Sequence, residues 1–303
     1  MSFSCATVSY AFPSSSADIA ASLDACFTHK KKKSPRDPPR AHPHTHFVPE
    51  EDAAKTEAYV DGLRSTDTRK EKRHKNMRDA LDEPEEDGYD HPLLRLPRSV
   101  LDGCEASFKA ADEKCAKAST ELFEDTAIMG LLCRHDRVLW LVNMHSAGEK
   151  QFYVLVLVET LFQHLPRNIR VGLLYDVACA FERSCRKWGF LSRYMDRLAF
   201  AVSVFHAFGH EWACQLLYHP RKREGFGFTN GEGCERFWHS ISHLIANLRI
   251  SGVSRDFISF GWLILTVPLL VPQPPLHAGQ PDRARRRSEP FPSRRMDFSP
   301  SSS

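Results

Sequence analysis

The chain has 303 residues, 42% of them hydrophobic and 26% charged, which suits one large domain or two small ones and excludes a fibrous or wholly disordered protein. Its formal net charge of +3 at pH 7 excludes a uniformly polycationic chain. Its nine cysteines are irregularly spaced and no secretory signal opens the chain, so we expect a reducing compartment in which cysteine fills the core or binds a metal.

The first segments of the chain predict a strand between two irregular stretches. Residues 1–17 are rich in serine and show no hydrophobic period, which predicts a disordered N-terminus. The next stretch, Ile19–Phe27 (IAASLDACF), predicts a short buried strand that is interrupted by Asp24. The segment HKKKKSPRDPPRAHPHTH comes after it, and its proline and histidine content predicts a loop.

Two charged stretches come next. Helical spacing and an acid-rich start predict a helix over Pro49–Arg64. Residues 65–97 are heavily charged and contain EPEED, which predicts a linker or a mobile insertion. We therefore expect residues 28–130 to form a loop, a charged linker and a helical insertion within a core that spans residues 18–252.

Apolar segments recur regularly from about Val100 to Gly252. The expected helices are Glu105–Thr120, Glu149–Leu165, Ala178–Trp188 and Gly231–Leu248, and the expected strands are Val138–Met144, Val171–Val177 and Ala199–Phe205. Strands that alternate with helices indicate a layered α/β fold.

The last part of the chain, residues 253–303, does not continue this pattern, and we expect a disordered tail. Its apolar run, Phe257–Val271, has 15 residues and contains Pro268. A membrane span needs about 20 apolar residues, so we expect no membrane association. Arginine, proline and serine dominate the remainder of this tail, and a splice or frame artefact or a degenerate gene end is a further interpretation of it.

Acidic residues stand at informative positions in the predicted elements. Asp24 lies inside an apolar strand, Asp176 ends another in LLYDVAC, and Glu232 and Glu235 begin a late helix in NGEGCERFW. A buried acid is costly unless it is paired or binds a metal, and ligands of α/β sheets bind beyond the carboxyl ends of strands. This order of acids matches ribonuclease H-like nucleases, in which carboxylates hold two Mg²⁺ ions about 4 Å apart.

Structural roles explain the same acids equally well at this stage. An aspartate at the end of a strand is often a turn or capping residue. Thr229-x-x-Glu232 matches a capping box at a helix N-terminus, and Glu235 lies one turn further along the same face. The pattern alone decides neither between metal binding and capping nor between the two glutamates.

Several long strings between residues 17 and 252 resemble, in order, the Kyakuja–Dileera–Zisupton transposases of fungi. They are SLDACFTHKKKK, FKAADEKCAKAST, LLCRHDRVLWLVNM, SAGEKQFYVLVLVETLFQHLP, VGLLYDVAC and the stretch from FAVSVFHAFGHEWACQ to ISHLIANLRISG. The resemblance implies a ribonuclease H-like DDE transposase core. It implies Asp24 and Asp176 as the first two metal-binding acids and Glu232 or Glu235 as the third.

The same resemblance implies Mg²⁺ or Mn²⁺ as cofactor, transposon-end and target DNA as partners, and cleavage followed by strand transfer. A DNA substrate, together with clusters of basic residues, predicts a nuclear location. Assembly into a homo-oligomer is left open. The likeness stops near Gly252, no cysteine-rich segment precedes the core, and His239 stands where we expect serine. An inactive or domesticated remnant that only binds DNA is therefore the alternative, and a ribonuclease H-like nuclease acting on RNA is a more distant one.

Histidines and cysteines suggest a second, structural metal. His206, His210 and Cys214 are spaced four residues apart and would share one face of a helix, with Cys133 and His135 as further ligands. A structural zinc ion held by them would attach the insertion to the core. In the alternative interpretation, the histidines line a DNA groove or satisfy core hydrogen bonds, and the cysteines pack in the core.

Basic residues gather in short clusters. The first consists of Lys30, Lys31, Lys32 and Lys33, and the second, just before the late helix, of Arg221, Lys222 and Arg223. Such clusters suit phosphate contacts, and solvated loops are the ordinary alternative. A further group, Arg283 to Arg287, suits nuclear import or phosphate binding in the same way.

Overall fold

The computed structural model describes residues 17–33, 46–79, 88–116 and 122–248. All of them fall within one compact unit, Met1–Pro268. The apolar segment 257–271, the arginine-rich tail and nearly all of the serine-rich N-terminal segment lie outside the described residues. In the described part of the chain, no helix has the length and hydrophobicity that crossing a membrane requires.

A five-stranded mixed sheet forms the centre of this unit, with strand order β5-β4-β1-β6-β7. Its strands are β1 (Ile19–Cys26), β4 (Ala127–Cys133), β5 (Val138–Met144), β6 (Val171–Tyr175) and β7 (Leu198–Ala201). β1 is antiparallel to β4 but parallel to β6, so one side of the sheet is antiparallel and the other parallel. A small separate ladder joins β2 (Lys31–Lys32) to β3 (Phe123–Asp125).

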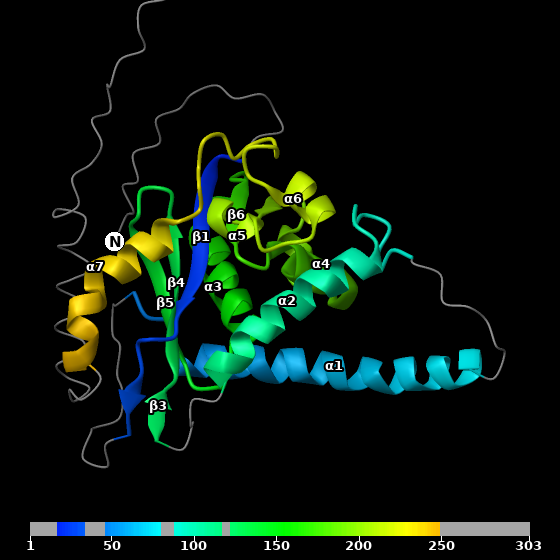
Figure 1. Cartoon of the computed structure of the whole chain (residues 1–303), viewed down its shortest axis with the longest axis horizontal. Helices are drawn as coiled ribbons and strands as arrows, with labels where there is room; N and C mark the ends of the chain where they lie inside the picture. The colour runs from blue at the N-terminus through cyan, green and yellow to red at the C-terminus, as the bar shows by residue number, and fades with distance from the viewer. Residues whose placement is uncertain (1–16, 34–45, 80–87, 117–121, 249–303) are drawn as a thin grey trace, which may run out of the picture. The chain divides into compact units, whose positions relative to one another are not determined.

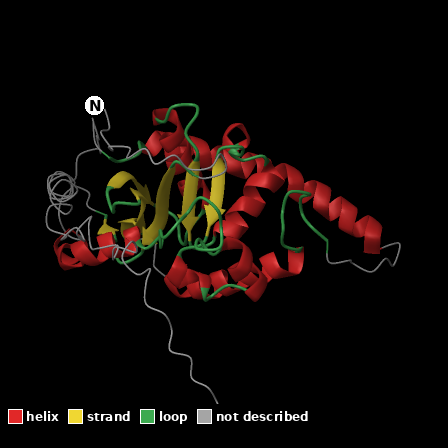
Figure 2. Cartoon of the chain, turned by 90° about the horizontal axis from the view of Figure 1, so that it is seen from above, coloured by secondary structure: helices red, strands yellow, loops and turns green. Residues whose placement is uncertain are grey.

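Helices cover both faces of the sheet (Figures 1 and 2). They are α1 (Glu50–Asp79), α2 (Arg98–Ala116), α3 (Gln151–His164), α4 (Ala178–Trp188), α5 (Val204–Ala207), α6 (Trp212–Tyr218) and α7 (Gly233–Leu248), with a 3₁₀ turn η1 (Ser192–Tyr194) after α4. The predicted α/β class is confirmed.

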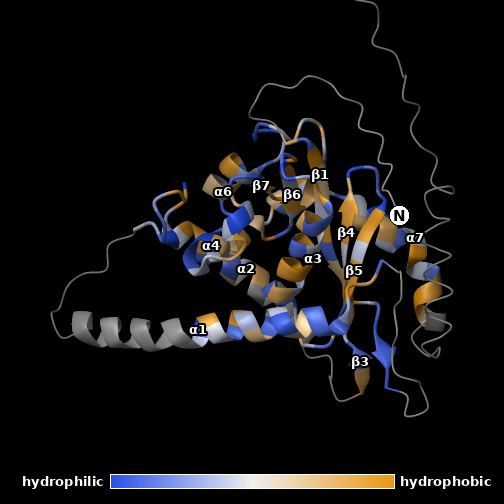
Figure 3. Ribbon diagram, turned by 180° about the vertical axis from the view of Figure 1, so that it is seen from behind, coloured by the Kyte–Doolittle hydropathy of each residue, from blue (hydrophilic) through white to orange (hydrophobic). Residues whose placement is uncertain are grey.

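Strand β4 shows why both faces must be covered. Its residues Met129 and Leu131 join the core cluster that contains most of α3, whereas Ile128 and Leu132 join the cluster formed by α7. Side chains alternate between the faces of a strand, so a strand buried on both faces is apolar along its whole length. Figure 3 shows apolar residues concentrated in these central strands.

Several elements differ from the predictions. Strand β4 was not predicted, although AIMGLLC is a continuous apolar run. α1 continues to Asp79, so residues 65–79 are helical rather than linker, because their lysine, arginine and glutamate residues favour helix. α2 begins at Arg98 instead of Glu105.

The strand predicted over Ala199–Phe205 is shorter than expected. β7 ends at Ala201, where the chain leaves the sheet: the Val202 amide donates to the Tyr218 carbonyl at 2.9 Å and the Val204 amide to the Asn230 carbonyl at 2.8 Å. These two hydrogen bonds direct α5 toward the start of α7.

Candidate active site

Three of the predicted acids meet at one edge of the sheet. Parallel pairing sets Leu23 of β1 opposite Tyr175 of β6, so the residues after them, Asp24 and Asp176, are neighbours. Glu235 approaches from the first turn of α7. The acid cluster, defined here as Asp24, Asp176 and Glu235, is thus built from two strands and one helix that lie far apart in the sequence.

His206 of α5 bridges two of these acids. Its Nδ1 lies 3.2 Å from Asp176 Oδ2, and its Nε2 lies 3.2 Å from Glu235 Oε1. His206 therefore lies against the acid cluster, apart from His210 and Cys214, with which it was predicted to share a zinc ion.

Burial and mutual repulsion make the two aspartates of the acid cluster hard to ionise. Burial, and then the charge of Glu235, raises the pKa of Asp24 to about 6. The pKa of Asp176 is raised well above its ordinary value by burial and then by the charges of Asp24, Glu149 and Glu235. A divalent cation would relieve this repulsion, and its preferred ligands are the carboxylate oxygens found here.

Glu149 is a fourth acid that the sequence did not reveal. It lies just before α3, accepts a hydrogen bond of 2.6 Å from the hydroxyl of the buried Tyr175, and contributes to the raised pKa of Asp176. Its surroundings in the sequence, SAGEK, carry no spacing or strand signal that points to a site.

Trp238 and Arg236 fix α7 against the sheet. The indole Nε1 of Trp238 donates to Asp24 Oδ2 at 2.7 Å. Its ring needs the glycine at position 130, opposite Asp24 on β4, because a Cβ at Gly130 would lie 3.1 Å from the ring. The guanidinium of Arg236 makes two bonds to the Asp136 carboxylate, of 2.6 and 2.7 Å. Both contacts hold Glu235 at the edge of the sheet.

Glu232 does not form the predicted capping box. Its Oε1 accepts a hydrogen bond of 2.9 Å from the Phe205 amide, whereas the Thr229 amide donates to the Phe226 carbonyl. Its own amide donates to the Asn230 side chain at 3.1 Å. Glu232 thus attaches α5 to the start of α7, and it remains close enough to His206 and Glu235 for the three to share an ion.

Substitution of Gly231, which lies in the turn that leads into α7, should cause a large loss of stability. Its φ is +85°, and an added Cβ would lie 2.8 Å from Ser203 Oγ and 2.9 Å from Leu174 Cδ2. We expect Gly231→Ala to lower the free energy of unfolding by about 2–4 kcal/mol, measured by urea titration. Gly189→Ala is the matched control, because that residue also has a positive φ, +72°, but open space around it. Equal losses in the two variants would show that packing at Gly231 contributes nothing.

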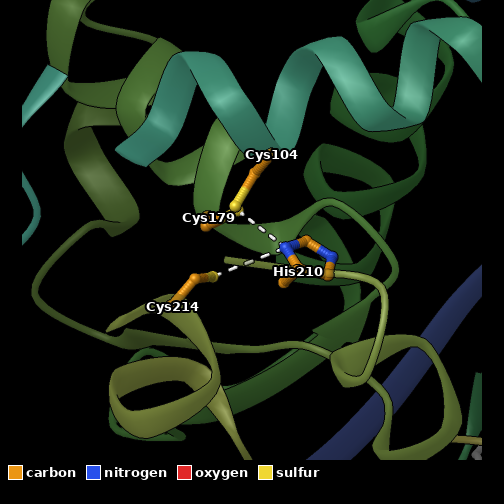
Figure 4. Close-up of side chains that lie close together, drawn as sticks. All are labelled: Cys104, Cys179, His210 and Cys214. Carbon is orange, nitrogen blue, oxygen red and sulfur yellow. Dashed lines mark hydrogen bonds between the residues drawn. The ribbon is translucent and has the colours of Figure 1, made fainter. Parts of the chain in front are cut away.

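A second cluster joins a histidine to three thiols (Figure 4). It consists of Cys104 of α2, Cys179 of α4, His210 from the connection between α5 and α6, and Cys214 of α6; we call it the Cys₃His cluster. One ligand atom from each residue lies within 4.8 Å of the others, so the cluster could hold a metal ion such as zinc. The three cysteines are buried and free of disulfides.

The structure brings together only some of the predicted zinc ligands. His210 and Cys214 lie in the Cys₃His cluster. The prediction that they share one helical face with His206 is wrong, because α5 ends at Ala207 and α6 begins at Trp212. Cys133 and His135 lie beside each other, with Sγ and Nδ1 3.9 Å apart, and take no part in this cluster. Cys104 and Cys179 complete the cluster instead.

The predicted basic clusters are divided by the fold. Lys31 is buried, and its Nζ lies 3.9 Å from the Glu124 carboxylate, so its charge is paired within the protein. Lys32 and Lys33 are exposed. The partly buried Lys30 has its Nζ 5.7 Å from the centroid of the Phe123 ring.

In the second basic cluster, Arg221 and Lys222 are exposed, and Lys222 lies over the Trp212 ring. Arg223 is half-buried, lies over the Tyr218 ring and is 3.9 Å from Glu182. Arg221 and Lys222 therefore have more freedom to contact a phosphate than Arg223.

Comparison with known proteins gives one match. A family model described as Kyakuja-Dileera-Zisupton transposase matches residues 17–256. No curated protein and no solved structure matches the chain. The matched range includes the acid cluster and the Cys₃His cluster, and it confirms the resemblance to this family.

Proposed function

Because the chain belongs to the Kyakuja–Dileera–Zisupton transposase family, we propose that it is a metal-dependent DNA transposase. It would hydrolyse a DNA phosphodiester in the nucleus. The freed 3′-hydroxyl would then attack a phosphodiester of the target strand, joining the two DNA ends and releasing a 3′-hydroxyl of the target. The observation that carries the proposal is the meeting of Asp24, Asp176 and Glu235 at one edge of a mixed sheet. An acid on β1, one after β6 and one on a late helix is the arrangement expected of a ribonuclease H-like core.

The donor types of the acid cluster support Mg²⁺ or Mn²⁺ as the proposed cofactor. Asp24, Asp176 and Glu235 offer hard oxygen ligands, and the raised pKa values of the two aspartates mark a site short of positive charge. Bound ions would supply activation of the attacking hydroxyl and stabilisation of the leaving oxygen. The chain's own part is to hold these carboxylates on rigid elements, with Trp238 orienting Asp24 through its indole N–H.

Glu235 is the better candidate for the third acid. Its charge raises the pKa of both Asp24 and Asp176, and its carboxylate shares His206 with Asp176. Glu232 raises the pKa of Asp176 less than Glu235 does, and one of its oxygens already accepts a hydrogen bond from the Phe205 amide. Glu232 thus has the features of a positioning residue for α5.

Exposed aromatic residues close to His206 and α7 in the chain suit a nucleic-acid substrate. Phe205 and Phe208 flank His206 and are 74% and 75% exposed, and Phe228, which precedes α7, is 94% exposed. Stacking of an unpaired base on an aromatic ring contributes about 1–3 kcal/mol. These rings would hold unpaired bases next to the bond to be cut. Arg221 and Lys222, which are nearby in the chain, would contact the phosphates.

Metal binding and plasmid nicking test this proposal together. We expect the purified chain to bind Mg²⁺ and Mn²⁺ in calorimetry and to nick supercoiled plasmid DNA with Mn²⁺. The variant Asp24→Ala, Asp176→Ala should do neither. The control Glu51→Ala, Asp61→Ala removes two exposed carboxylates of α1 and should behave as the parent does.

The outcomes separate the candidate functions. A parent chain that binds no divalent ion would contradict the proposal. One that binds the ions and DNA without nicking would instead support the DNA-binding remnant.

A further inference from the structure

We propose that the Cys₃His cluster binds one structural zinc ion, and that this ion, through His210, fixes the backbone that carries Asp176. The zinc site rests only on the geometry of the cluster. Its effect on Asp176 also rests on the proposed function of the acid cluster.

The distances in the cluster suit tetrahedral zinc. His210 Nδ1 lies 3.5 Å from Cys179 Sγ and 3.4 Å from Cys214 Sγ. A tetrahedral ion with Zn–S and Zn–N bonds of about 2.3 and 2.0 Å places sulfur and nitrogen ligands about 3.5 Å apart. The remaining ligand atoms also lie within 4.8 Å of one another, so all four can reach one centre.

The donor types favour zinc over the ions of the acid cluster. Thiolates are soft ligands that select zinc, whereas Mg²⁺ prefers oxygen. The backbone amide of Glu211 points at Cys104 Sγ at 3.4 Å, an arrangement that stabilises a thiolate. Three thiolates and one neutral imidazole complete a closed four-coordinate site, which is the form that structural zinc takes.

Zinc would connect elements that the sequence keeps apart. Cys104 belongs to α2, in the charged region between β1 and β4, whereas Cys179 belongs to α4 and Cys214 to α6. α2 contacts both of these helices, and Arg183 of α4 adds ion pairs to Asp102 and Glu105 of α2 at 2.5 and 3.7 Å. The ion would therefore attach the inserted helix to the sheet edge that bears the acids.

His210 links the two sites directly. Its Nε2 lies 2.7 Å from the backbone carbonyl oxygen of Asp176, so Nε2–H donates and Nδ1 keeps its lone pair for the metal. Metal-binding histidines usually donate their second N–H in this way. Cys179 lies three residues after Asp176, so two ligands of the same ion would hold the turn after β6.

Zinc content is the first test. Untagged full-length protein should contain one zinc ion per chain by elemental analysis, and Cys214→Ala should abolish it. Cys185→Ala is the matched control, because Cys185 is an equally buried thiol of α4 outside the cluster. Cys133→Ala should also retain the metal. A parent chain without zinc, or equal zinc in the parent and in Cys214→Ala, would overturn the site.

A second variant separates binding from coupling and remains informative if Cys214→Ala fails to fold. His210→Cys keeps a fourth soft ligand but lacks the N–H donor to the Asp176 carbonyl. We expect it to retain zinc and to bind Mn²⁺ at the acid cluster about tenfold more weakly, measured by electron paramagnetic resonance. Zinc retention with unchanged Mn²⁺ affinity would overturn the coupling.

The two proposals can fail independently. Zinc content is read without DNA or Mn²⁺, so loss of the transposase proposal leaves the zinc result standing. Mn²⁺ binding by a zinc-free parent chain would leave the acid cluster intact and remove only the zinc site.

Discussion

Replacing Asp24 by asparagine is expected to abolish DNA cleavage while stabilising the metal-free protein. Cleavage should fall by on the order of 10³-fold, because in the proposed function Asp24 is a metal-binding carboxylate at the reacting phosphate. The gain in stability arises because the pKa of Asp24 is raised from 3.8 to about 6, so ionising it costs the folded state about 2–3 kcal/mol at neutral pH. Asparagine keeps an oxygen acceptor for the Trp238 indole.

The pH dependence of this effect has a definite sign. A raised pKa means that the folded protein holds the proton more tightly, so the contribution of Asp24 to stability is fully present below pH 3.8 and is lost as pH rises through about 6. The advantage of Asp24→Asn should therefore be largest at pH 7.5 and shrink to about half at pH 5, in urea titrations with EDTA.

Added Mg²⁺ should reverse the order of stability. Saturating Mg²⁺ stabilises only the form that binds it, so the parent chain should gain and Asp24→Asn should not. An Asp24→Asn variant that is less stable than the parent in EDTA would show that groups within the protein already stabilise the Asp24 carboxylate. The argument that this carboxylate needs a metal ion would then fail.

The strand acids could be predicted because local sequence determines their positions. Asp24 interrupts an apolar run and Asp176 ends one, and the ends of neighbouring parallel strands meet at one edge of a sheet. Glu149 could not be found in this way. Its place beside Asp176 depends on the Tyr175 hydroxyl and on how α3 packs against the sheet, and neither leaves a pattern in the sequence.

The Cys₃His cluster shows the same limit for metal ligands. Regular spacing led to His206, yet the break between α5 and α6 sends His206 to the acids and His210 to the thiols. Cys104 and Cys179 are 75 residues apart by their numbers and meet only because α2 packs on α4. Spacing within one segment cannot reveal ligands that tertiary contacts bring together.

Glu235→Gln and Glu232→Gln should differ strongly, although both remove one charge from the start of α7. Glutamine at position 232 keeps an oxygen that accepts from the Phe205 amide, so α5 stays in place and cleavage should fall less than about tenfold. Glutamine at position 235 removes the carboxylate that interacts with Asp24, Asp176 and His206, so cleavage should fall by on the order of 10³-fold.

Mn²⁺ titrations beside the nicking assay distinguish loss of a metal ligand from loss of structure. Glu235→Gln should bind Mn²⁺ more weakly and unfold at the same urea concentration as the parent or higher, because it relieves repulsion on Asp24 and Asp176. The reverse ranking, with Glu232→Gln inactive and Glu235→Gln active, would assign the third acid to Glu232. In that case the Phe205 amide would have to release the Glu232 carboxylate when metal binds, and α5, which carries Phe205, would move as the site assembles.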